Sequence, residues 1–221
     1  MIYLKENHQE IDAVIFDLGN VLLDYSPARF LHEVGIPENL HKRISDTLFN
    51  DYEVWSKLDA GLLDNAGITE QAVQREPELH QEIHHYMNNW ASYFKAIPEN
   101  VETMYRIKET GTGVYVLSNF SGETFEIMKE HNAFLSDFDG MILSYEHNLI
   151  KPQPEIYQLL LDTYPINPKR AVFIDDLLEN VEAARKAGLL AILHPACAPV
   201  APYFILPEDT DEQELDEGHE Q

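Results

Sequence analysis

The sequence predicts an α/β fold: a parallel sheet flanked by helices, with a helical segment inserted after the first strand. Two patterns carry this prediction. Short apolar runs alternate with helical stretches along most of the 221 residues, and one long interval lacks strand periodicity. A chain of this length can bury one core of ordinary size together with a modest inserted module. We therefore expect one α/β core that carries one helical insertion.

Five short apolar or β-branched runs, bounded by turn or polar residues, are the strand candidates. They are residues 11–18, 113–119, 140–144, 170–176 and 189–194. Helices are expected between them. Pro98 and Pro154 stand where a helix can begin, and Gly111 and Gly188 each follow a stretch with a helical pattern.

Residues 26–95 are the interval without strands. They are rich in helix formers and aromatics, and their apolar residues recur at helical spacing. We expect them to form a helical cap on a core that comprises residues 1–25 and 96–207. Residues 208–221 are dense in acidic side chains, which predicts a disordered tail.

The composition limits the classes of function. Hydrophobic residues make up 44% and charged residues 24%, as in a soluble globular protein, and no apolar run is long enough to cross a bilayer. A cytoplasmic protein without a secretory leader is expected. The formal net charge of -24 argues against binding to nucleic acid, which requires clustered Lys and Arg. The single cysteine, Cys197, cannot form an internal disulfide, and no feature predicts an oligomeric state.

The first segment that indicates chemistry is AVIFDLGNV, in which an apolar strand runs directly into Asp17. A carboxylate at the carboxyl end of a strand lies where open α/β sheets bind their ligands. Taken alone, this aspartate is better explained as a residue that caps the following turn. The functional interpretation depends on the other strand ends.

Three later segments place polar side chains that suit one phosphate and one divalent cation. VYVLSN ends in Ser118 and Asn119, IKPQPEIY presents Lys151 before a helix, and AVFIDD ends in Asp175 and Asp176. Each segment is a weak signal by itself. A carboxylate, a hydroxyl, a lysine and paired acids in this order form a specific pattern.

In this pattern the chain resembles the haloacid dehalogenase superfamily, in the subfamily with a helical cap after the first strand. The resemblance covers Ile11 to about Pro195. It implies a Rossmann-like core with strand order 3-2-1-4-5, which would bring Asp17, Ser118 and Asp176 together. The DLGNV form of the first motif is also similar to that of bacterial phosphatases acting on glucose 1-phosphate.

The resemblance implies an enzyme that depends on Mg²⁺. Asp17 would attack phosphorus and form a phosphoaspartyl group, which water then hydrolyses. Oxygen ligands suit Mg²⁺, so Asp17, the Gly19 carbonyl and Asp176 would bind the ion, with Asp175 orienting a metal-bound water. The order of the two adjacent acids follows the family pattern.

The remaining residues of the pattern would bind the phosphoryl group of a small phosphorylated metabolite. Lys151 would neutralise one oxygen as a point charge, and Ser118 with the Asn119 N–H would hydrogen-bond the others. Asn180 lies four residues after Asp176, where capping a helix and supporting the site are equally good explanations.

One position departs from the family. Most phosphatases of the superfamily carry a second aspartate two residues after the nucleophile, which protonates the leaving group and activates water, and here that residue is Gly19. Loss of a proton-transfer group typically costs a factor of about 10² to 10⁴ in rate. An anomeric sugar phosphate has a fairly acidic leaving group, which makes a sugar phosphate the first candidate substrate.

Three alternatives stay open at this point. A catalytically weak member could bind a phosphorylated ligand or act as a regulatory protein. A haloacid dehalogenase would attack carbon without a metal, but Asp175 and Asp176 suit a cation better. A phosphomutase would also need proton transfer at Gly19.

Four aromatic residues could line a pocket from the cap side, namely Tyr25, Phe30, Trp55 and Trp90. Packing within the cap is the preferred interpretation of each.

Overall fold

The computed structural model describes residues 2–49 and 52–207. Its centre is a five-stranded sheet in which every neighbouring pair is parallel. The strands are β3 (Ala13–Phe16), β6 (Gly113–Ser118), β7 (Gly140–Leu143), β8 (Ala171–Asp175) and β9 (Leu190–Leu193). Each lies inside one of the five runs predicted from the sequence, so the α/β class is confirmed.

The strands lie in the order β7-β6-β3-β8-β9. These labels differ from 3-2-1-4-5 because β1, β2, β4 and β5 lie outside this sheet; counted among themselves along the chain, the five strands read 3-2-1-4-5. In the central strand, Phe16 pairs with Val116 on one side and Ile174 on the other. The residues that follow these three strands therefore meet at one edge of the sheet.

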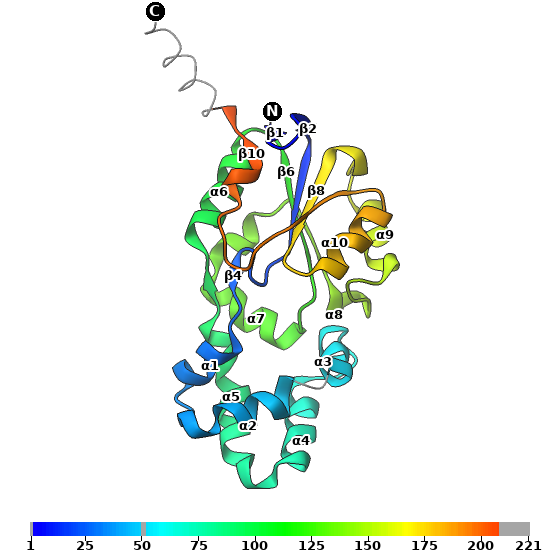
Figure 1. Cartoon of the computed structure of the whole chain (residues 1–221). Coiled ribbons are helices and arrows are strands. Elements are labelled where there is room, and N and C mark those ends of the chain that lie inside the picture. The colour runs from blue at the N-terminus through cyan, green and yellow to red at the C-terminus, as the bar shows by residue number, and fades with distance from the viewer. Residues whose placement is uncertain (1, 50–51, 208–221) are drawn as a thin grey trace, which may run out of the picture.

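Two helices cover each face of the sheet (Figure 1). They are α6 (Pro98–Glu109) with α7 (Gly122–His131), and α9 (Pro154–Thr163) with α10 (Leu178–Lys186). Alternate residues of β3 explain this arrangement, since successive side chains of a strand point to opposite faces. Val14 and Phe16 pack in the core cluster that includes α6 and α7, whereas Ala13 and Ile15 pack with α9 and α10.

Among its described residues, the stretch predicted as a cap contains five α-helices, which gather at one end of the molecule (Figure 1). They are α1 (Pro27–Val34), α2 (Glu38–Phe49), α3 (Tyr52–Asp59), α4 (Asn65–Arg75) and α5 (His80–Asn89). Local signals set their ends: the Ser26 hydroxyl accepts a hydrogen bond from the Arg29 N–H at the start of α1, and Gly35 ends it at a φ of 86°. The antiparallel pair β4 (Leu23–Asp24) and β5 (Lys95–Ala96) joins this stretch to the sheet.

A second small sheet lies outside the predictions. Its strands are β1 (Ile2–Leu4), β2 (Gln9–Ile11) and β10 (Phe204–Ile205), all antiparallel. Strands of two or three residues leave no periodicity in a sequence. The short helix α8 (Ser144–His147) follows β7 directly.

Two further predictions concern the C-terminal tail and the membrane. The acidic tail at 208–221 lies outside the described residues. Within the part of the chain that the structure describes, no helix combines the length and the apolarity needed to span a membrane.

Candidate active site

Asp17 follows the central strand β3, and its side chain is buried at the carboxyl edge of the sheet. Two of the predicted partners reach the same oxygen. The Ser118 hydroxyl donates to Asp17 Oδ1 at 2.8 Å, and the Lys151 ammonium lies 2.7 Å from it. The structure thus brings together the three residues that the sequence pattern placed 101 and 134 positions apart.

Lys151 is 3% exposed and makes a second ion pair, with Asp175 Oδ2 at 2.7 Å. Its backbone is fixed by the side chain of Asn119, which donates to the Lys151 carbonyl at 3.0 Å and accepts from the Lys151 N–H at 2.8 Å. The side-chain amide of Asn119 therefore holds the lysine in place. The backbone N–H of Asn119, which the sequence analysis predicted as a ligand contact, is the group of this residue that can bind a phosphoryl oxygen.

The adjacent acids differ in their surroundings. Asp175 is fully buried and accepts hydrogen bonds from the Leu177 N–H at 2.8 Å and from Asn180 Nδ2 at 3.0 and 3.1 Å. Asp176 is less buried, lines the pocket, and accepts one hydrogen bond from Asn20 Nδ2 at 2.8 Å. Asp175 is thus tied into the protein, whereas Asp176 keeps oxygen lone pairs for a ligand.

Asn20 is a site residue that the sequence reasoning missed. Its φ of 58° is left-handed, a conformation that asparagine tolerates better than most residues. The tight turn sends its amide to Asp176, while its carbonyl accepts a hydrogen bond from the Cys197 N–H at 2.7 Å. The signal available was an asparagine in a turn directly after the strand that ends in an acid.

The described residues contain one cluster of acids that could hold a metal ion. Carboxylate oxygens of Asp17, Asp175 and Asp176 all lie within 4.8 Å of one another. Oxygen donors in such a set suit a hard cation such as Mg²⁺. Gly19, whose carbonyl was predicted as a further ligand, lies in the same loop and lines the pocket.

The charges of the site favour an additional cation. Burial raises the pKa of Asp17, although the nearby Lys151 ammonium opposes the effect. Burial lowers the pKa of Lys151, but Asp17 and Asp175 outweigh this and raise it, so the lysine stays charged. Burial also raises the pKa of Asp176, with Asn20 opposing it. One ammonium faces three carboxylates, and a bound cation would relieve the excess of negative charge.

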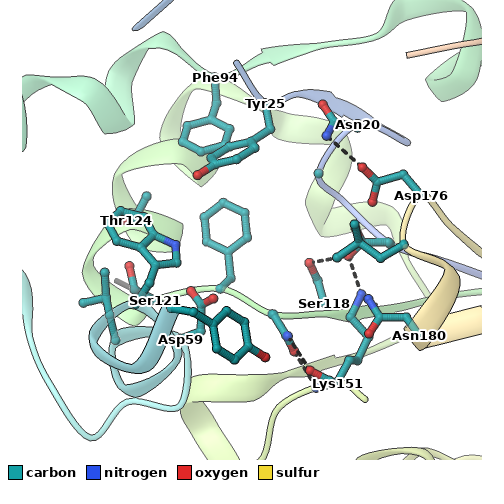
Figure 2. Close-up of a pocket in the computed structure, with 18 of the residues that line it drawn as sticks. Asn20, Tyr25, Asp59, Phe94, Ser118, Ser121, Thr124, Lys151, Asp176 and Asn180 are labelled. Atoms are coloured by element: carbon teal, nitrogen blue, oxygen red, sulfur yellow. Dashed lines mark hydrogen bonds and ion pairs between the residues drawn. The ribbon is translucent and has the colours of Figure 1, made fainter. Parts of the chain in front are cut away.

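A cavity of about 310 Å³ opens from this cluster toward α3 and toward Trp90 and Phe94, which follow α5. Figure 2 shows Ser118, Asp176 and Asn180 on one side of it and Asp59 and Ser121 on the other. The floor of the cavity is therefore the edge of the sheet, and its opposite wall combines residues of the predicted cap, such as Asp59, with residues of the core, such as Ser121.

Three of the four aromatic residues singled out in the sequence line this cavity. Tyr25, Trp55 and Trp90 do so, whereas Phe30 is fully buried and packs its ring 5.9 Å from that of Trp90. Packing and lining coexist, because Trp55 and Trp90 also contact each other at 5.8 Å. The preferred interpretation, packing alone, holds only for Phe30.

Asp59 is the second residue that the sequence reasoning missed. It ends α3, lines the cavity, and is the acid that the helical stretch contributes to the lining. Burial raises its pKa to about 7, the Lys151 ammonium opposes this, and the Asp17 carboxylate adds to it. No motif marks it, because its nearness to the site arises only from the fold.

The sequence pattern of the haloacid dehalogenase-like hydrolases matches residues 11–188. The chain is 23% identical over 180 residues to the sesquiterpene phosphatase astK of Aspergillus oryzae, covering 81% of this chain and 88% of the relative. It is 26% identical over 192 residues to a phosphorylated carbohydrates phosphatase of Thermotoga maritima, covering 81% and 82%.

Among solved structures, the fold is similar to that of the enzyme BT-2542 of Bacteroides thetaiotaomicron in complex with magnesium and inorganic phosphate. The TM-score is 0.66 at 21% identity, covering 84% of this chain and 95% of that one. At this identity the likeness concerns the fold alone. Because the family pattern spans most of the chain and the buried carboxylate cluster lies at the expected sheet edge, the protein belongs to the haloacid dehalogenase-like hydrolase family.

Proposed function

We propose that this protein is a Mg²⁺-dependent phosphatase that forms a phosphoaspartyl group on Asp17. The observation that carries the proposal is the convergence of Ser118 and Lys151 on one oxygen of Asp17, at 2.8 and 2.7 Å. This leaves the other carboxylate oxygen for attack on a substrate. Membership of a hydrolase family and the similarity to two phosphatases support the same chemistry.

The acid cluster fits a divalent cation, and we assign its ligands by their surroundings. Asp17, the Gly19 carbonyl and Asp176 would hold Mg²⁺, whereas Asp175, already bonded to Lys151 and Asn180, would orient a water molecule. When bound, the ion would cancel the repulsion between the attacking carboxylate and the phosphate.

The residues of the chain divide the remaining work. The Asp17 carboxylate attacks phosphorus in line with the leaving oxygen, and its charge passes to the leaving group. Lys151 and the Ser118 hydroxyl neutralise and hydrogen-bond the phosphoryl oxygens, which gain negative charge in the transition state. Because Lys151 is buried between two acids, its ammonium is held in position before the substrate arrives.

A sugar phosphate remains the first candidate substrate. Aromatic rings at the cavity wall, such as Tyr25 and Trp55, can stack on the apolar face of a sugar ring. Two buried polar atoms of the lining, Trp90 Nε1 and Thr124 Oγ1, have no hydrogen-bond partner among residues 2–49 and 52–207. Sugar hydroxyls would satisfy such groups, which are costly to leave unpaired.

A phosphate ester with an apolar leaving group is the second candidate. The cavity wall is dominated by large apolar and aromatic side chains, and one similar protein is a sesquiterpene phosphatase. An isoprenoid chain would remove these side chains from water at a gain of roughly 25 cal/mol per Å². The unpaired atoms of Trp90 and Thr124 favour the sugar over this alternative.

The three alternatives raised by the sequence receive less support. A metal-free dehalogenase has no need of the cluster formed by Asp17, Asp175 and Asp176. A binding protein without turnover has no need of Lys151 between two buried acids. A phosphomutase would also need a proton-transfer group at the position of Gly19, which supplies none.

The test is phosphate release from a panel that contains p-nitrophenyl phosphate, hexose 1-phosphates, hexose 6-phosphates and an isoprenoid monophosphate. Wild type is compared with Asp17→Asn, with and without Mg²⁺. The matched control is Asp162→Asn, which alters an exposed aspartate on α9. Release that needs Mg²⁺ and Asp17 but not Asp162 supports the proposal. Release that is insensitive to Mg²⁺, or no release from any ester, contradicts it.

A further inference from the structure

The carboxylate of Asp59 reaches the active-site cavity from the helical side of the molecule. It lies across the cavity from Ser118 and Asp176, and the aromatic rings of Tyr25 and Phe94 also border the cavity (Figure 2). The phosphoryl group of a substrate bound at Asp17 occupies the floor of the cavity. Its leaving group therefore extends toward the wall that contains Asp59.

The backbone around Asp59 is docked on the core of the protein. The Ser144 hydroxyl donates to the Asp59 carbonyl at 2.5 Å, and Asn148 Nδ2 donates to the Ala60 carbonyl at 2.8 Å. Gly61, with a φ of 68°, passes so close to Tyr145 that an added Cβ would lie 2.6 Å from the Tyr145 carbonyl oxygen. These contacts fix the end of α3 against the short helix α8 and against Asn148, which follows it.

Ser144 also connects Asp59 to the catalytic loops. Its oxygen accepts a hydrogen bond from the Phe120 N–H at 2.9 Å, two residues after the Ser118 that contacts Asp17. The buried Ser144 hydroxyl thus links the backbone of Phe120, in the loop after β6, to the backbone carbonyl of Asp59. Packing within the core therefore fixes the position of the Asp59 backbone relative to the loop of Ser118, which contacts Asp17.

The fold offers no structural reason for an acid at this position. Asp59 is the last residue of α3, where a negative charge opposes the helix dipole. Among residues 2–49 and 52–207, its carboxylate makes no hydrogen bond and no ion pair. A partly buried, unpaired carboxylate at an active-site wall is destabilising for the fold unless it has another use.

We propose that Asp59 is the general acid and general base of the reaction, in place of the residue that Gly19 cannot supply. The proposal rests on the phosphatase function proposed above. It assigns proton transfer to the wall of the cavity that faces the leaving group, whereas Gly19 lies in the loop of the nucleophile.

The proton balance closes over one cycle. In the first step an Asp17 oxygen bonds to phosphorus, the bond from phosphorus to the leaving oxygen breaks, and the Asp59 carboxyl proton passes to that oxygen. In the second step the Asp59 carboxylate takes a proton from water as the water oxygen bonds to phosphorus. The bond between Asp17 and phosphorus then breaks, so the products are the alcohol and inorganic phosphate, and both acids return to their starting states.

The electrostatics support these roles. Three groups face Asp59 across the cavity: the Asp17 carboxylate, the Lys151 ammonium and the Tyr25 hydroxyl. Burial and Asp17 raise the pKa of Asp59 to about 7, against the opposing effect of Lys151. A carboxyl group in this range can both give and take a proton near neutral pH.

The experiment compares Asp59→Asn with Glu70→Gln, a neutralised acid on an exposed part of α4. Two esters are used with Mg²⁺ present: a hexose 6-phosphate, whose alkoxide must be protonated, and p-nitrophenyl phosphate, whose leaving group is stable as an anion. For the hexose 6-phosphate we expect Asp59→Asn to lower kcat by about 10²-fold or more. For p-nitrophenyl phosphate we expect a first burst of nitrophenolate, followed by slow turnover because water is no longer activated.

A rescue variant distinguishes proton transfer from a loss of shape. At Gly19 an added Cβ would meet its nearest neighbours only at 3.8 Å, so the site has room for the missing aspartate. The double variant with Asp59→Asn and Gly19→Asp is expected to recover hexose 6-phosphate turnover at least tenfold over Asp59→Asn alone. Circular dichroism of each variant verifies that it is folded.

Three outcomes overturn the proposal. Asp59→Asn could keep kcat within threefold for both esters, or raise KM for one ester without lowering kcat, which would mark substrate binding. The double variant could also fail to recover. If wild type itself showed no Asp17-dependent release, the proposed function would fall and this proposal with it. An active wild type with an unaffected Asp59→Asn variant overturns this proposal alone.

Discussion

The carboxyl edge of the sheet and the helical wall opposite it border the same cavity, but they are held in different ways. At the sheet edge, Lys151 forms ion pairs of 2.7 Å with both Asp17 and Asp175, and the Ser118 hydroxyl donates to Asp17 at 2.8 Å. At the wall, Trp55 and Trp90 are held by ring contacts, and polar atoms such as Trp90 Nε1 are left unpaired.

This difference suits the two regions to different roles, the sheet edge to the reaction and the wall to substrate recognition. A network of charged hydrogen bonds holds its atoms rigidly, which suits groups that act on one phosphate. Apolar packing tolerates changes of shape, and unpaired polar atoms await a ligand. We therefore expect the edge of the sheet to determine the chemistry and the wall to select the substrate. Asp59 is the exception, since it belongs to the wall and we assign it to the reaction.

The largest effect is expected from Lys151→Met, which breaks the network at the sheet edge. Two buried carboxylates lose their cation, and removing one partner of a buried ion pair costs roughly 3 to 5 kcal/mol of unfolding free energy. Activity should fall about 10²-fold or more. Urea unfolding and phosphate release measure both, with Lys129→Met on the exposed face of α7 as the control. Equal stability of the two variants would contradict the network.

A smaller effect is expected from Asn119→Leu, which leaves every charge in place. It removes the two hydrogen bonds, at 3.0 and 2.8 Å, that hold the Lys151 backbone. We expect a loss of roughly 1 to 3 kcal/mol in unfolding free energy and a lower kcat, because the ammonium is less well placed. An unchanged kcat would show that the Asp17 and Asp175 pairs suffice to position Lys151.

The wall is tested by Trp55→Ala. Its ring lines the cavity and contacts Phe49 at 4.9 Å and Trp90 at 5.8 Å. We expect KM for the preferred substrate to rise about tenfold, as for the loss of an apolar contact, while kcat for p-nitrophenyl phosphate stays near wild type. Trp55→Phe, which keeps a ring, serves as the control. A fall in kcat for both esters would place Trp55 with the chemistry.

The last prediction concerns the pH dependence of stability at Asp59. The folded state raises its pKa from 3.8 to about 7, so ionisation is disfavoured by folding. The unfolding free energy of wild type therefore falls relative to that of Asp59→Asn as the pH rises from about 4 to 7, and the difference then stays constant. Urea midpoints of both proteins at pH 4.5 and 8, compared with Glu70→Gln, measure this difference. A midpoint for Asp59→Asn below that of wild type at pH 8 would contradict it.

Much of the sheet edge was predictable from local patterns. The runs before Asp17, Ser118 and Asp175 are apolar and short, and parallel strands bring their carboxyl ends to one edge. Residues that act through a turn or a side-chain amide were harder to assign. Asn20 reaches Asp176 only because its backbone is left-handed, and Asn119 holds Lys151 with an amide that the sequence cannot orient.

The sequence by itself determined the α/β class, and it predicted a helical interval at 26–95 and the acids and lysine that we propose for the site. This was possible because strand and helix periods and the residues that end strands are local properties of the chain. Only the tertiary structure decided which wall residues face the cavity. Asp59 lies 42 positions from Asp17, and its approach depends on the docking of α3 through Ser144, a contact across 85 residues. Contacts over such separations follow from the packing of whole elements, which no local pattern encodes.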